Sequence, residues 1–101
     1  MDNTLKQKWI ERLKTNIKPQ DTDVFREKNS FCALGVLMDV INPNGWFIDA
    51  TGTYGHDLLK EINASNVQTR SIGGLNFHQM HLVVQAYEIS LFEAIKVIKE
   101  L

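Results

Sequence analysis

Cys32 is the chain's one cysteine, and it is the second residue of an apolar stretch that begins at Phe31. If that stretch is a helix, Cys32 lies in its first turn, where unpaired N–H groups and the helix dipole would stabilise a thiolate. His56, His78 or His81 could then act as the base of a Cys/His nucleophile pair. The neighbours of Cys32 are apolar, however, and burial disfavours a charged thiolate. We therefore expect a structural cysteine and keep a small Cys/His-dependent hydrolase or transferase as the alternative function.

Two further residue sets are incomplete as chemical sites. His78 and His81 are three residues apart, so both could face one metal ion from a helix, but no motif supplies the remaining zinc ligands. Asp39 is an isolated carboxylate in an apolar segment, and if buried it needs partners such as Arg26, Lys28 or nearby backbone N–H groups. We expect this structural role rather than that of a catalytic acid. The sequence therefore predicts no metal, no other cofactor and no catalytic residues.

Aromatic and basic residues gather in the middle of the chain. Trp46, Tyr54, His56 and Arg70 belong to types that suit binding surfaces, with Trp, Tyr and Arg enriched at interface hot spots. Aromatic and guanidinium planes also suit stacking on a nucleobase. Phe47 is expected to point into the core instead. We predict that the other four residues form a ligand- or partner-binding surface.

An amphipathic helix must precede these residues, because Leu5, Trp9 and Leu13 recur every four positions before Pro19. Five cations lie on its other face and could contact phosphate: Lys6, Lys8, Arg12, Lys14 and Lys18. The formal net charge is −1, whereas nucleic-acid binders usually carry a basic excess. A DNA-binding regulator is therefore the third hypothesis, and we do not expect a nucleic-acid partner.

Residues 31–41 are the most apolar segment of the chain, with Asp39 as their one charge. This pattern predicts a central helix that other elements surround, ended by the turn residues 42–45. We expect the structural core to include residues of the first helix and of this segment: Trp9, Phe31, Cys32, Leu34, Gly35, Leu37 and Met38.

The remaining chain predicts a small sheet and more helices. Residues 46–48 and 50–54 flank a glycine turn and read as a β-hairpin, with 67–72 as a third strand. A short helix is expected over 56–63. We thus predict an α+β, mainly helical fold, with about five helices around residues 31–41 and a small hairpin or sheet within 46–72. At 101 residues the chain is expected to form a single domain, 1–101.

Capping motifs mark the last two helices. Asn76 and Ser90 are each followed three residues later by Gln or Glu, which is the capping-box pattern. The first of these helices is expected to bury a stripe of four residues: Phe77, Met80, Val84 and Tyr87.

The segment Phe31–Asp39 reads F-C-A-L-G-V-L-M-D. It resembles the F-C-C-L-G-V-L-C-D-L signature of a widespread group of small phage and prophage proteins. A Trp in the first helix (Trp9), a Gly-Trp after the signature (residues 45–46) and a related segment at 86–95 follow the order of features in that group. The resemblance implies a phage or prophage origin and a fold, but no chemistry. Ala33 and Met38 stand where the group usually has cysteines, so no metal or redox role is expected there.

These observations predict a non-enzymatic phage or prophage accessory protein that acts in the host cytoplasm. It would bind and block a host component. This component would be either a protein, such as part of a defence system, or a small nucleotide signal that the protein sequesters as a sponge. No signal-peptide pattern is present, and no apolar run approaches the ~20 residues needed to span a bilayer. We therefore expect no membrane association, and a homodimer remains open.

Overall fold

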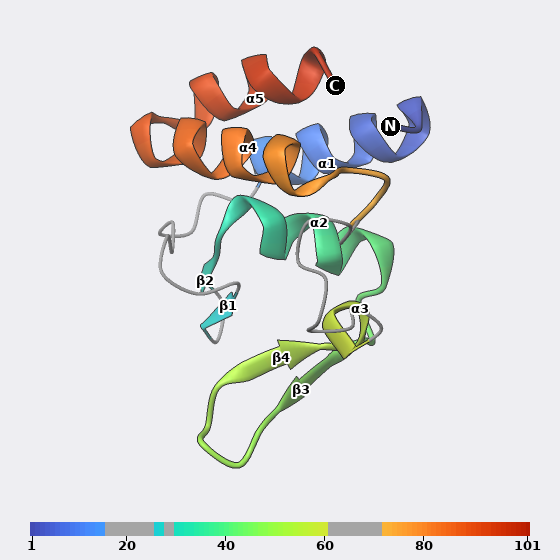
Figure 1. Cartoon of the computed structure of the whole chain (residues 1–101), viewed down its shortest axis with the longest axis vertical. Coiled ribbons are helices and arrows are strands. Elements are labelled where there is room, and N and C mark those ends of the chain that lie inside the picture. The colour runs from blue at the N-terminus through green and yellow to red at the C-terminus, as the bar shows by residue number, and fades with distance from the viewer. Residues whose placement is uncertain (16–25, 28–29, 61–71) are drawn as a thin grey trace.

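The computed structural model describes residues 1–15, 26–27, 30–60 and 72–101, and most of these described residues are helical (Figure 1). The elements in chain order are α1 (Asn3–Thr15), β1 (Arg26–Glu27), β2 (Ser30–Phe31), α2 (Ala33–Ile41), β3 (Trp46–Ile48), β4 (Tyr54–His56), α3 (Asp57–Lys60), α4 (Phe77–Ile89) and α5 (Leu91–Lys99). The predicted mainly helical fold with a small hairpin is confirmed. Among the described residues, four helices are longer than one turn, against the predicted total of about five, because α3 is a single turn of four residues.

α1 packs on α2 through the predicted apolar stripe. Trp9, Ile10 and Leu13 are buried on one side of α1. Its first turn is capped by Asp2, whose Oδ2 accepts a hydrogen bond of 2.8 Å from the Leu5 N–H. On the opposite face of α1, Lys8 and Lys14 are exposed, as the charge pattern indicates.

α2 begins two residues later than predicted. Phe31 lies in β2, opposite Arg26 of β1, and Cys32 is the N-cap of α2 rather than part of its first turn. Its Sγ accepts a hydrogen bond of 3.3 Å from the Gly35 N–H. All residues from Ala33 to Met38 are buried, so other parts of the protein cover most sides of this apolar helix. It packs against both α1 and α4.

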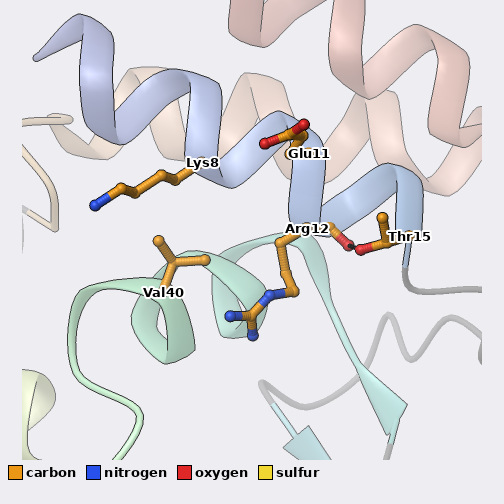
Figure 2. A pocket seen from close by; sticks show the side chains of 5 residues that line it. All are labelled: Lys8, Glu11, Arg12, Thr15 and Val40. Atoms are coloured by element: carbon orange, nitrogen blue, oxygen red, sulfur yellow. Dashed lines mark hydrogen bonds between the residues drawn. The ribbon is translucent and has the colours of Figure 1, made fainter.

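A groove of about 440 Å³ runs along the solvent side of the α1–α2 contact. Figure 2 shows Lys8 and Arg12 of α1 reaching over α2 on either side of Val40. Glu11 and Thr15 complete its lining. The lining carries both positive and negative side chains, and Arg12 is paired with Asp39. The groove therefore does not favour one kind of ligand.

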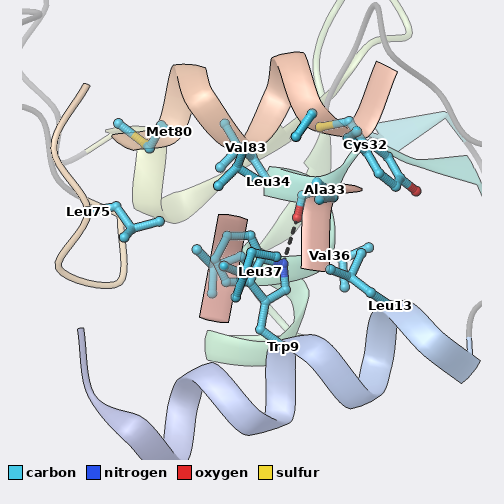
Figure 3. Close-up of a cluster of buried hydrophobic side chains, with 14 of the residues drawn as sticks. Trp9, Leu13, Cys32, Ala33, Leu34, Val36, Leu37, Leu75, Met80 and Val83 are labelled. Carbon is cyan, nitrogen blue, oxygen red and sulfur yellow. Dashed lines mark hydrogen bonds between the residues drawn. The ribbon is translucent and has the colours of Figure 1, made fainter. Parts of the chain in front are cut away.

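The buried core is built from α1, α2, α4 and α5 (Figure 3). Trp9 anchors it: the indole is fully buried, and its Nε1–H donates to the Ala33 carbonyl at 2.9 Å. The predicted core residues Trp9, Cys32, Leu34, Gly35, Leu37 and Met38 are all buried. The prediction was wrong for Phe31, which is only half-buried and packs at the margin of the core.

The last two helices begin at their predicted caps. At Asn76 both halves of the capping box are present, with bonds of 2.8 and 2.9 Å between Asn76 and Gln79. The buried stripe of α4 is Met80, Val83, Ala86 and Tyr87, whereas Phe77 is 49% exposed and Val84 is half-buried. The predicted stripe was wrong at these two positions, because α4 packs on both α2 and α5 and its buried face is therefore centred on Val83.

The turn before α4 is fixed by two glycines. Gly73 and Gly74 both have positive φ, 62° and 84°, which suits a two-residue hairpin turn. Ile72 and Leu75 form a β-bridge around it. The rest of the predicted strand 67–72, and residues 61–63 of the predicted short helix, lie outside the described residues. None of the described helices has the length and apolar character that crossing a bilayer would require.

Candidate binding site

The β3–β4 hairpin carries most of the candidate site. Its pairs are Trp46 with His56, Phe47 with Gly55 and Ile48 with Tyr54. Because alternate side chains on a strand share a face, Trp46, Tyr54 and His56 lie on one face of the hairpin. Phe47 lies on the other, where its ring covers Gly55 so closely that a Cβ there would meet it at 2.5 Å.

Asp49 organises the turn of this hairpin. Its Oδ1 accepts bonds from the Thr51 N–H (2.8 Å), the Thr51 hydroxyl (2.6 Å) and the Thr53 N–H (3.0 Å). These donors favour the ionised carboxylate, and the Thr51 hydroxyl bond is the main reason that the pKa of Asp49 is lowered. Gly52, with φ of 81°, supplies the left-handed residue that the turn needs.

His56 is buried at the inner end of the hairpin. Its Nε2 lies 2.8 Å from the Asn42 carbonyl, and its Nδ1 accepts a bond of 3.1 Å from the Leu58 N–H. This pattern requires a proton on Nε2 and a lone pair on Nδ1. The ring also packs edge-on against Trp46, with centroids 4.7 Å apart. His56 therefore joins the end of α2 to the start of α3 and does not face a ligand, which corrects its assignment to the binding surface.

Asp39 connects the hairpin to the helices. Its Oδ2 lies 2.7 Å from Arg12 Nη1 of α1, and its Oδ1 accepts a bond of 2.8 Å from Trp46 Nε1. The prediction that Arg26 pairs with Asp39 was wrong, since the described side chains that contact this carboxylate are Arg12 and Trp46. Lys28 lies outside the described residues. A half-buried carboxylate thus fixes the orientation of the Trp46 indole.

Four side chains form what we term the aromatic–arginine cluster: Arg26, Phe31, Trp46 and Tyr54. The Arg26 Cζ lies 4.5 Å from the ring centroid of Tyr54, 4.9 Å from that of Phe31 and 5.3 Å from that of Trp46. All three distances are within the range of cation–π attraction. Phe31 and Trp46 also meet edge-on, with centroids 5.8 Å apart. One guanidinium is therefore surrounded by three aromatic rings.

The cluster lies at the surface, since all four residues are half-buried. Two of the predicted binding residues, Trp46 and Tyr54, belong to it, while Arg70 lies outside the described residues. Arg26 and Phe31 were missed as binding residues. Their pairing across β1–β2 brings them together, and strands of two residues leave no readable alternation in a sequence.

The candidate thiol chemistry finds little support in the geometry. Cys32 is 7% exposed and its sulfur serves as a helix cap, while both ring nitrogens of His56 are engaged elsewhere. His78 and His81 lie on the exposed side of α4, where His81 stacks on Phe77. Within the described ranges, no three His, Cys, Asp or Glu side chains are grouped as a metal site would need.

Tyr87 lies close to Cys32 in the core. Burial raises the pKa of the Tyr87 hydroxyl above 10.0, and the adjacent Cys32 adds a smaller rise because a thiolate would repel a phenolate. The Tyr87 hydroxyl is thus held in its neutral form in the interior, where a buried charge is costly.

The profile of one protein family, described as "Domain of unknown function (DUF8296)", matches residues 1–69. The chain belongs to this family. No curated protein and no solved structure matches the chain. The part that matches the DUF8296 family contains the whole aromatic–arginine cluster, together with Asp39 and His56, while α4 and α5 follow it.

Proposed function

We propose that this member of the DUF8296 family is a non-enzymatic binding protein that presents the aromatic–arginine cluster to a partner. The observation that carries the proposal is the grouping of Arg26, Phe31, Trp46 and Tyr54 at a half-exposed surface. Aromatic rings and Arg are the side chains that contribute most to binding at protein interfaces. The Trp46 ring is also pre-oriented, since its indole N–H is bound to Asp39, which lowers the entropy cost of binding.

The partner in this proposal is a component of a host cell, and the protein acts in the host cytoplasm as a phage or prophage accessory protein. The resemblance of Phe31–Asp39 to the phage signature supports this origin. In this proposal α2 is the central helix: its buried residues hold it rigid, and through Asp39 it holds Trp46 in place. We take the partner to be a protein, because aromatic and Arg side chains are the types enriched at the hot spots of protein interfaces.

The test is affinity capture from host extract with wild-type protein and two alanine variants. Tyr54→Ala removes one ring of the cluster, whereas Phe92→Ala removes an aromatic ring that is 68% exposed on α5, far along the chain from the cluster. Both variants should keep the fold, as shown by circular dichroism. We expect the captured partner to be lost with Tyr54→Ala and kept with Phe92→Ala. Loss with Phe92→Ala alone would place the interface on α4–α5 and refute the proposal.

A second variant separates binding from thiol chemistry. Cys32→Ser keeps a capping side chain at the start of α2. We expect it to retain partner capture, whereas a hydrolase or transferase that uses the Cys32 thiolate would lose its activity. Native mass spectrometry of the recovered complex would also identify a bound nucleotide or a second copy of the chain.

A further inference from the structure

The aromatic–arginine cluster has the composition of a cation-binding cage. Three aromatic faces surround the site, and they belong to three different strands: β2, β3 and β4. Aromatic cages of this kind attract cations because the face of each ring carries negative potential. Such cages prefer weakly hydrated cations, and guanidinium is more weakly hydrated than ammonium.

Asp39 strengthens this preference from behind. Its carboxylate accepts the indole N–H of Trp46 at 2.8 Å, which polarises the indole toward a more negative ring face. The carboxylate side chain is 19% exposed and paired with Arg12, which offsets its charge, so Asp39 acts on the cage through the indole bond. At the other end of the hairpin, the ionised Asp49 adds a negative charge at the surface.

Arg26 fills the cage from the same chain. Its guanidinium makes the contacts that any incoming guanidinium would make, and it is held by two-residue pairing between β1 and β2 rather than by a helix. An occupant tethered in this way lowers the apparent affinity for an outside ligand by the fraction of time that the cage is open. It also keeps three half-buried rings covered in the free protein.

We infer that the cage is a receptor for an arginine side chain of the partner protein, and that this side chain binds by replacing Arg26. The inference rests on the proposed function and adds the chemistry of the group that is recognised. Exchange of one guanidinium for another preserves the cation–π contacts with the three rings, which lowers the cost of displacing Arg26 from them.

The experiment is a titration with N-acetyl-arginine amide, followed through the indole N–H signals of ¹⁵N-labelled protein. The chain has two tryptophans, and only Trp46 touches the cage, so the signal of the buried Trp9 is an internal control. N-acetyl-citrulline amide, which has nearly the same shape but no charge, is the matched ligand control. We expect the Trp46 signal to shift with the arginine ligand and not with the citrulline ligand, while Trp9 stays in place.

The decisive comparison is between wild type and Arg26→Ala. Removal of the tethered competitor should make the arginine ligand bind about tenfold more tightly, so that a truncation increases affinity. Trp46→Ala, read through the backbone amides of β4, should abolish binding. Equal affinity of wild type and Arg26→Ala, an equal response to citrulline, or no Trp46 shift in either protein would overturn the inference.

Arg26→Ala could lose the β1–β2 pairing, so the wild type supplies an independent measurement. As the arginine ligand binds, the side-chain Nε–H signal of Arg26 should move toward the value of a free arginine. A Trp46 shift with an unmoved Arg26 signal would contradict displacement. If Tyr54→Ala abolishes partner capture while the cage binds no arginine, this inference fails and the proposed function stands. If capture is insensitive to Tyr54, the proposed function fails as well.

Discussion

The two tryptophans show how differently the two ends of this molecule are built. Trp9 and Trp46 donate indole hydrogen bonds of nearly equal length, 2.9 and 2.8 Å. Trp9 donates to a backbone carbonyl within the aliphatic core, whereas Trp46 donates to a carboxylate and packs on Phe31, His56 and Arg26. The helical end is thus held by burial of apolar surface. The hairpin end is held by polar and cation–π contacts that a partner could exchange.

The largest expected effect is on the helical side. Trp9→Ala should lower the free energy of unfolding by about 3–5 kcal/mol, because removal of the ring leaves an apolar cavity between α1 and α2. Since small domains have about 5–15 kcal/mol of stability in total, this variant should be close to unfolding. Urea denaturation measures it, with Trp46→Ala as the matched variant. The comparison fails if Trp46→Ala, which removes a half-buried ring, costs as much as Trp9→Ala.

Gly45→Ala tests how tightly the hairpin is joined to α2. A Cβ at this position would meet His56 at 2.5 Å from Cε1 and 2.7 Å from Nε2. His56 is fully buried and bonded through both nitrogens, so it cannot move aside, and we expect a loss of about 1–3 kcal/mol. Thermal unfolding measures it.

Gly52→Ala is its control, because nothing lies within 4 Å of a Cβ there and the one cost is the positive φ. That cost is about 1–2 kcal/mol. The indole N–H signal of Trp46 in the NMR spectrum should shift in Gly45→Ala but not in Gly52→Ala. Unchanged contacts at His56 in Gly45→Ala would show that this junction is looser than described.

Asp39 is where the two ends meet, and a double-mutant cycle separates its two bonds. Asp39→Ala should cost about 1–3 kcal/mol, because it leaves the partly buried Trp46 N–H without its acceptor. Arg12→Ala should cost less than about 1 kcal/mol, since the Arg12 side chain is 49% exposed and its ion pair is screened by solvent. Chemical denaturation of both single variants and the double variant gives the coupling. A larger loss for Arg12→Ala would show that the ion pair, and not the indole bond, secures the hairpin.

The smallest expected effect is a pH dependence at the tip of the hairpin. The pKa of Asp49 is lowered from 3.8 in the folded state, so its bonds stabilise the turn above that value and are lost as the pH falls through the folded pKa. Asp49→Asn should therefore weaken the turn at neutral pH and differ little from wild type in strong acid. The amide shift of Thr53 across an acid titration reports this. A titration midpoint at or above 3.8 would contradict the described bonds.

The helical end could be predicted from the sequence because its signals are periodic. The four-residue spacing of Trp9 and Leu13 marks the buried face of α1, and the side chains of Asn76 and Ser90 cap α4 and α5 as predicted. The hairpin followed from the glycine turn, although its second strand is Tyr54–His56 and not 50–54.

The cluster was only half predictable. Alternation along a hairpin explains why Trp46 and Tyr54 share a face, but it says nothing of how deeply each residue is buried, which is why His56 was misplaced. The approach of Arg26 depends on a contact between strands of two residues, and such contacts have no sequence signal. The helix start moved from 31 to 33 for the same reason, since Phe31 is taken into β2.

Ser90 has a consequence for how the molecule folds. It ends α4, where its N–H donates to the Ala86 carbonyl at 3.1 Å, and it begins α5, where its Oγ accepts from the Glu93 N–H at 3.1 Å. With one residue serving both helices, fraying of either would remove the cap of the other. α4 and α5 should therefore form and melt as one cooperative unit, and their amides should exchange with solvent at a common rate.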